Sequence, residues 1–149
     1  MSNLVYVLLA AGAGGCLALQ ASANTRFRAN LGDNPLFASF FSICGTVATA
    51  GLAMLVLRPP APTAEAVRQT EWWNWVGGPL GALVVLSGAA LVSKLDAALF
   101  IACVVAGQLL AALLLDHFGL MGLKHVPLSP GRVVGALLVL AGVVCVKYL

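Results

Sequence analysis

Four polar side chains interrupt long apolar stretches of this sequence. Their chemical types and their spacing would allow them to form a hydrogen-bonding or ion-binding site. Gln20 and Asn24 are four residues apart, so on a helix they share one face. Gln108 and Asp116 are eight residues apart and fall near one face of another helix. A side-chain amide is harder to satisfy on its own helix than a hydroxyl. We therefore expect Gln20, Asn24 and Gln108 to line a polar cavity, with structural hydrogen bonds between helices as the alternative.

Asp116 is the acidic residue best placed for proton or cation chemistry. It closes the apolar run "AGQLLAALLLDHFGL" and is followed directly by His117. A carboxylate at the mouth of a cavity could carry a proton or bind a cationic substrate, and Asp96 is the next candidate. In the alternative interpretation, Asp116 only marks the end of an apolar segment at its boundary with water.

Hydroxyl side chains form a stripe in the stretch before residue 57. Ser39, Ser42, Thr46 and Thr49 recur at spacings of three, four and three residues, which places them on one face of a helix. Ser42 and Thr46 would then join the amide side chains in lining a pathway for a substrate or an ion. Packing between helices is the alternative, because a serine or threonine hydroxyl can also bond to its own helix backbone.

The composition indicates that lipid is the solvent for most of this chain. Of the 149 residues, 61% are hydrophobic and 9% are charged, against about 25% charged residues in a typical soluble domain. A soluble domain of this size could not bury so much apolar surface. The net charge of +3 comes from isolated basic residues, so no nucleic-acid partner is expected.

No pattern in the sequence indicates covalent catalysis, a metal or a cofactor. His117 and His125 stand too far from other ligand types to suggest a metal site. The cysteines lie inside apolar runs without a CxxC pair: Cys16, Cys44, Cys103 and Cys145. We therefore expect no catalytic residues, no metal, no cofactor and no enzymatic activity.

The elements that must position the polar residues are membrane-spanning helices, each of about 20 mostly apolar residues. Five such segments occur, at about residues 4–23, 36–57, 72–92, 97–115 and 130–148. They predict an all-α, polytopic membrane protein with a single transmembrane domain over residues 1–149. Ala21-Ser22-Ala23 resembles a signal-peptide cleavage site. However, no basic residue precedes the first segment, so we expect a retained helix.

Local signals mark three of the helix starts. Asp33-Asn34-Pro35 and Ser129-Pro130 each place a capping residue before a proline, which suits a first helical turn. The stretch "WWNW" at residues 72–75 is typical of an aromatic belt at a membrane interface. Arg132 and Lys147 lie close to the ends of the last span, so both should extend towards the two interfaces.

Basic residues are distributed evenly between the two sides of the predicted membrane topology. One side would carry Arg58, Arg68, Lys124 and Arg132, and the other Arg26, Arg28, Lys94 and Lys147. Four against four gives no orientation bias, whereas most membrane proteins show one. Either the chain inserts in both orientations and pairs antiparallel, or another feature sets its orientation.

Glycines recur at positions where helices could approach closely. Gly131 and Gly135 form a GxxxG motif, Gly142 follows seven residues later, and Gly77 and Gly78 open the third span. Small residues promote close helix packing in membranes. We expect these five glycines to contribute to helix packing or to a dimer contact.

Four segments of the sequence carry a recognisable pattern: "QASANTRFRANLGDNPLFASFFSICGTVA", "WWNWVGGPLGALVV", "VVAGQLLAALLLDHFGLMG" and "LSPGRVVGALLVLAGV". Together they resemble the YdcZ-like family of small bacterial inner-membrane proteins in the drug/metabolite transporter superfamily. The resemblance implies a multi-pass inner-membrane protein that forms half of a ten-helix transporter, used as a pair. It also places marked polar positions at Gln20, Asn24, Gln108 and Asp116. The small multidrug transporters carry a Glu in their first helix, and this chain has none there.

These observations predict a secondary transporter that exports small organic solutes. It would act by alternating access as a homodimer or with a homologous half-transporter, in contact with the lipid bilayer and a small-molecule substrate. The alternative is a non-transporting membrane scaffold or a regulatory subunit of a partner membrane protein.

Overall fold

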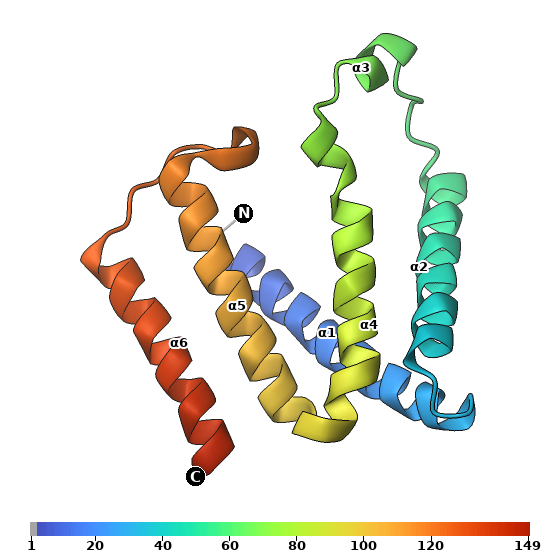
Figure 1. Cartoon of the computed structure of the whole chain (residues 1–149). Coiled ribbons are helices and arrows are strands. Elements are labelled where there is room, and N and C mark those ends of the chain that lie inside the picture. Colours follow the sequence, from blue (N-terminus) through green and yellow to red (C-terminus); the bar gives the residue numbers. More distant parts are fainter. Residues whose placement is uncertain (1–2) are drawn as a thin grey trace. The chain divides into compact units, whose positions relative to one another are not determined.

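A computed structural model describes residues 3–149, which form six α-helices and two short 3-10 helices (Figure 1). No strand occurs among these residues. The elements are α1 (Asn3–Asn30), α2 (Pro35–Leu57), α3 (Ala64–Arg68), η1 (Trp72–Trp75), α4 (Gly77–Leu95), α5 (Ala97–Phe118), η2 (Leu120–Gly122) and α6 (Pro130–Tyr148). Five helical segments within the described residues are long and apolar enough to cross a membrane. The expected all-α fold with five spanning helices is confirmed.

The helix ends differ from the apolar segments where polar residues continue a helix. α1 runs past residue 23 to Asn30 and includes Thr25 and Arg28. Hydropathy measures solubility in lipid, whereas a helix continues for as long as its backbone hydrogen bonds continue. At the third span, residues 72–75 form the short helix η1, and α4 begins only at Gly77.

The two predicted cap-and-proline signals start helices in the structure. The Asn34 side chain accepts a hydrogen bond from the Leu36 backbone N–H ahead of α2, at 2.9 Å. Ser129 caps α6 in the same way through the Arg132 backbone N–H. Asp96 caps α5 by accepting from the Leu99 N–H at 2.9 Å. Each cap satisfies one of the donors that a helix start leaves without a partner.

The chain divides into two compact units. In the N-terminal unit, up to Ser93, α1 packs on α2 and is hydrogen-bonded to α4. Its buried residues are mostly small: Ala21, Asn24, Ala38, Ser39, Gly88, Ala89 and Val92. In the C-terminal unit, residues 94–149, α5 and α6 pack together as a hairpin. The organisation as one transmembrane domain stays a prediction.

Most large apolar side chains on the long helices are exposed. Leu57 on α2 is 77% exposed, and Leu138 on α6 is 67% exposed. Helices in a soluble protein turn such residues towards a core, whereas a spanning helix presents them to lipid chains. The exposed faces therefore fit contact with the bilayer.

The predicted packing glycines face open space within the described residues. A Cβ atom added at any of five positions would meet no atom within 4 Å: Gly77, Gly78, Gly131, Gly135 and Gly142. Close approach inside this chain is instead made by other small residues, such as Ala89 and Ala136, which are both buried. The contribution of the glycines to a dimer contact stays a prediction.

Candidate functional site

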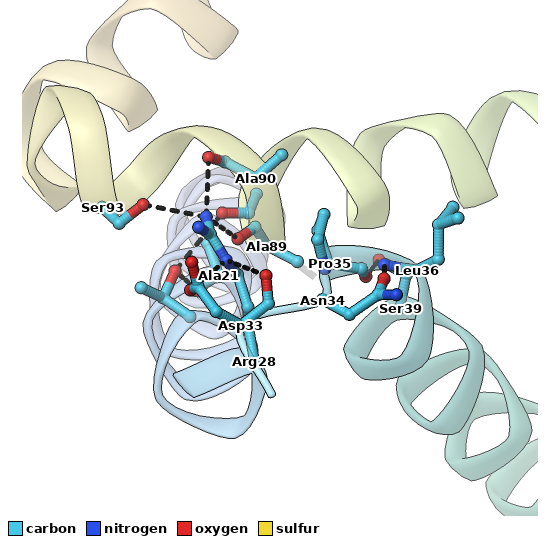
Figure 2. A network of polar contacts seen from close by, with 12 residues as sticks. Ala21, Arg28, Asp33, Asn34, Pro35, Leu36, Ser39, Ala89, Ala90 and Ser93 are labelled. Carbon is cyan, nitrogen blue, oxygen red and sulfur yellow. Dashed lines mark hydrogen bonds and ion pairs between the residues drawn. The ribbon is translucent and has the colours of Figure 1, made fainter. Parts of the chain in front are cut away.

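The N-terminal unit holds a polar network around Arg28, near the end of α1 (Figure 2). One guanidinium nitrogen, Nη1, donates to the α4 backbone oxygens of Ala89 (3.4 Å) and Ala90 (3.1 Å) and to Ser93 Oγ (3.0 Å). These acceptors lie in the last two turns of α4, where the helix dipole favours a positive charge. Arg28 therefore joins α1 to the C-terminal half of α4.

Asp33 completes this network from the loop after α1. Its carboxylate lies 2.8 Å from Arg28 Nε, and its backbone oxygen also accepts from that nitrogen. Gly32 and Asp33 both have positive φ angles, which turn the chain back so that the Asp33 N–H bonds to the Arg28 backbone oxygen. Only 14% of the Arg28 side chain is exposed, against 75% for Asp33. The guanidinium is thus neutralised and largely buried.

This network was not predicted from the sequence, in which Arg28 counted only as a loop charge. The available signal was an arginine in what the structure shows to be the last turn of α1, followed five residues later by an aspartate in a Gly-containing turn. That spacing allows the aspartate to fold back onto the arginine. The partners on α4 are more than 60 residues away in the sequence, so only the packing of α1 on α4 reveals them.

Asn24 lies one turn before Arg28 on α1 and is almost fully buried, at 5% exposure. Its side-chain nitrogen Nδ2 is buried and has no hydrogen-bond partner among residues 3–149. Burying a polar group without a partner destabilises a protein by about 1–3 kcal/mol. Such groups are rare and often have a functional explanation. Asn24 is therefore the predicted pathway residue with the clearest unused hydrogen-bonding capacity.

Replacing Asn24 with Leu should stabilise the protein, because the new side chain has a similar size and no unpaired donor. We expect the free energy of unfolding to rise by about 1 kcal/mol, measured by thermal unfolding in detergent. Thr25→Val is the matched control at the next position. The Thr25 hydroxyl bonds to Ala21 O at 3.0 Å and to Gly88 O at 3.3 Å, so its loss should lower stability. A loss of stability in Asn24→Leu would contradict the assignment of an unpaired donor.

The hydroxyl stripe on α2 is satisfied largely by its own helix. Ser39, which is buried, donates to Pro35 O at 2.7 Å, Thr46 to Ser42 O and Thr49 to Gly45 O. Ser42 is half-buried and Thr46 is exposed. These hydroxyls retain acceptor capacity for a solute or a second helix, so their place on a pathway stays a prediction.

The predicted amides and the carboxylate fall into both units. Gln20 is half-buried on α1, one turn from Asn24, whereas Gln108 is exposed on α5. Within the C-terminal unit, Asp116 is half-buried near the end of α5. Gln108 and Asp116 share the helix α5.

Asp116 forms an ion pair with Arg132 of α6. Arg132 Nη1 donates to Asp116 Oδ2 at 3.1 Å, and about a third of each side chain is exposed. Arg132 was expected to extend alone towards the membrane interface, and its pairing with Asp116 was not predicted from the sequence. Asp116 therefore does more than end an apolar segment, because it also connects α5 to α6.

The loop between α5 and α6 positions this pair. α5 ends at Phe118 and is capped by Gly119, whose left-handed conformation (φ 60°) suits glycine. The Val126 N–H then bonds to the Asp116 backbone oxygen at 2.8 Å, and the Leu128 N–H to His117 Nδ1 at 3.3 Å. The loop thus returns to the end of α5, and α6 starts with Arg132 in its first turn.

Two hollows flank the contact between α5 and α6. One, of about 400 Å³, contains the ion pair at one end and is lined by Leu109, Ala112, Leu113, Asp116, Arg132, Gly135, Ala136 and Val139. The other, of about 350 Å³, is lined entirely by apolar residues, including Leu110, Leu114 and Leu137. We call the first the ion-pair hollow and the second the apolar hollow. Volumes of this order suit a small organic molecule.

The described residues contain no group of three or more His, Cys, Asp or Glu side chains close enough to hold a metal ion. His117 and His125 lie with ring centroids 6.1 Å apart. The polar groups described here form hydrogen bonds and ion pairs, with Asn24 and Arg28 in the N-terminal unit and Asp116 and Arg132 in the C-terminal unit.

Comparison with known proteins places these features in a family. Residues 5–145 match the family described as "Putative inner membrane exporter, YdcZ". The chain is also 36% identical over 80 residues to "Inner membrane protein YdcZ" of Escherichia coli (strain K12). That match spans about half of each protein, 52% of this chain and 52% of the relative. No solved structure matches the chain.

Proposed function

The chain belongs to the family described as "Putative inner membrane exporter, YdcZ", and from this membership we propose that it is a secondary transporter of small organic solutes. It is a multi-pass protein of the bacterial inner membrane, with five helices able to span the bilayer. The family match over residues 5–145 is the observation that carries the proposal. The unpaired Asn24 amide and the Asp116–Arg132 pair supply polar groups of the kind that transport pathways need.

We propose that two copies, or one copy and a homologous half-transporter, form the working unit of ten helices. Transporters are commonly built from two repeats of opposite orientation that alternate access to one central site. The four-against-four distribution of basic residues suits insertion in both orientations. Glycine faces that are open on α4 and α6 would supply close contacts between the two copies.

The pathway in this proposal is lined by Gln20, Asn24, Ser42, Thr46, Gln108 and Asp116. Asn24 contributes a free donor, and Asp116 is the acidic group for coupling to protons. A carboxylate that binds a proton and a substrate in turn couples the movement of one to that of the other. Arg132 holds Asp116 in position through the 3.1 Å hydrogen bond.

The purified chain should transport solutes without another protein. We expect proteoliposomes loaded with the pH dye pyranine, acidic inside, to lose protons faster than protein-free vesicles on addition of an exported solute. The test compounds are tetramethylammonium, guanidinium, tetraphenylphosphonium and L-leucine. Proton exit at the protein-free rate with all four would count against a self-sufficient exporter of such solutes.

A membrane scaffold or regulatory subunit is the second candidate function, favoured by the open glycine faces. Such a protein would be inactive alone and would purify in a fixed ratio with another membrane protein. Inactive proteoliposomes together with a stoichiometric partner would support this second function. Activity of the purified chain would exclude it as the sole function.

A further inference from the structure

The ion-pair hollow has charged groups at one end only. Asp116 and Arg132 lie at the end of α5 and the start of α6, and apolar or small residues form the rest of its lining. Leu109 precedes Asp116 by seven residues, and Val139 follows Arg132 by seven, about 10 Å along each helix. A ligand that fits this shape has a compact polar group joined to an apolar body.

The ion pair leaves binding capacity on both of its members. The contact uses one carboxylate oxygen of Asp116 and one nitrogen of Arg132. A guanidinium has five N–H donors, and a carboxylate has a second oxygen. A ligand can therefore add one donor to Asp116 and one acceptor to Arg132 without breaking the existing contact.

The charge balance of the hollow selects against ligands that carry one charge. Asp116 and Arg132 neutralise each other, so a cation or an anion would introduce an uncompensated charge beside apolar walls, which is unfavourable. A zwitterion introduces none, because its ammonium group faces Asp116 and its anionic group faces Arg132. The two protein atoms are 3.1 Å apart, so the two charges of the ligand must also be close together.

We propose that the ion-pair hollow binds a free α-amino acid with an apolar side chain, and that such amino acids are a substrate class of this exporter. The amino group donates to Asp116, the carboxylate accepts from Arg132, and the side chain lies along Leu109, Leu113 and Val139. The transport part of this inference rests on the proposed function, whereas the binding part does not. The amino-acid substrate replaces the cationic substrate suggested by the sequence, because the sequence did not show that Arg132 pairs with Asp116.

Equilibrium binding of radiolabelled L-leucine to the purified protein in detergent tests the site without requiring transport. We expect saturable binding that unlabelled L-leucine displaces. Leucinamide, which carries only the positive charge, and 4-methylpentanoate, which carries only the negative charge, should compete roughly tenfold less well or worse. Glycine keeps both charges but lacks the apolar body, and should also compete roughly tenfold less well or worse.

A pair of variants on α5 places the binding site in one hollow. Ala112 lines the ion-pair hollow and Leu114 the apolar hollow, so Ala112→Phe should abolish leucine binding and Leu114→Phe should preserve it. Arg132→Gln should weaken leucine binding at least tenfold. If leucine bound at another site, this substitution would change its affinity little. Size-exclusion profiles of the variants identify any that fail to fold, and Val139→Trp is the second hollow-filling variant.

The outcomes separate this inference from the proposed function. Leucine binding without transport in proteoliposomes would support the site and count against the exporter. Transport of another test compound without leucine binding would overturn the amino-acid inference and leave the exporter in place. Phosphatidylethanolamine retained by the wild type in native mass spectrometry, lost in Arg132→Gln and unaffected by leucine, would overturn the inference by assigning the hollow to a lipid head group.

Discussion

Replacing Asp116 with Asn should abolish proton-driven export while leaving the fold intact. An amide keeps the shape of the carboxylate and can still accept from Arg132, but it can neither bind a proton nor compensate the guanidinium charge. Loss of one charge-assisted contact removes about 1.5 kcal/mol, roughly a tenfold loss of substrate affinity. The proton-driven component should disappear altogether. Proton exit from pyranine-loaded proteoliposomes measures the proton-driven component, and equilibrium binding of radiolabelled L-leucine in detergent measures the affinity.

Asp96→Asn is the matched control, because it makes the same chemical change at the opposite end of α5. Asp96 is exposed and caps α5 through the Leu99 N–H, and Asn caps helices as well as Asp does. We expect wild-type export from this variant. Equal loss of export in both variants would show that general surface charge matters rather than the carboxylate of Asp116. Normal proton-driven export by Asp116→Asn would remove Asp116 from the mechanism.

Replacing Arg28 with Met should strongly destabilise the N-terminal unit. The largely buried guanidinium joins three polar groups of α4 to the Asp33 carboxylate, and Met keeps the length of the side chain but no donor. We expect a loss of about 2–4 kcal/mol, which lowers the Tm by on the order of 10 °C. Arg28→Lys should recover only part of this loss. A single ammonium group lacks the planar set of donors with which the guanidinium reaches both α4 and Asp33. Thermal unfolding in detergent, followed by the helical circular dichroism signal, measures the change.

Arg26→Met provides the control for charge and topology. Arg26 lies two residues earlier on α1 and is exposed, and its removal deletes one positive charge from the same connection between spans. Any effect of that charge on membrane orientation is therefore equal in both variants. We expect a Tm close to that of the wild type for Arg26→Met. A similar decrease in both variants would contradict the role of the Arg28 network.

The spanning helices could be predicted because few backbone structures are stable in lipid. A backbone in hydrocarbon must satisfy its own hydrogen bonds, so a long apolar segment becomes a helix whatever its neighbours are. The starts of α2 and α6 were also readable, since Asn34 and Ser129 act on donors within three residues. The end of α1 was not readable from hydropathy, because residues 24–30 are helical without being apolar enough for lipid.

The candidate site could be predicted only in part. Asn24 and Asp116 stood out because polar groups in apolar segments are costly, and the structure leaves Asn24 Nδ2 without a partner and pairs Asp116. Their partners could not be derived in the same way. Arg132 appeared as an interfacial charge and Arg28 as a loop charge. Asp116 lies 16 residues from Arg132 in the sequence, and the α4 acceptors of Arg28 are more than 60 residues away.

The sequence by itself thus determined the solvent, the number of spanning helices, the caps of α2 and α6, and the polar residues whose burial in apolar surroundings is unfavourable. These properties depend on composition and on interactions within a few residues. Only the tertiary structure decided that Arg28 reaches α4, that Arg132 neutralises Asp116 and that a hollow with one charged end lies beside α6. A hydrogen bond or an ion pair requires atoms within about 3 Å, and the packing of helices distant in the sequence brings those atoms together.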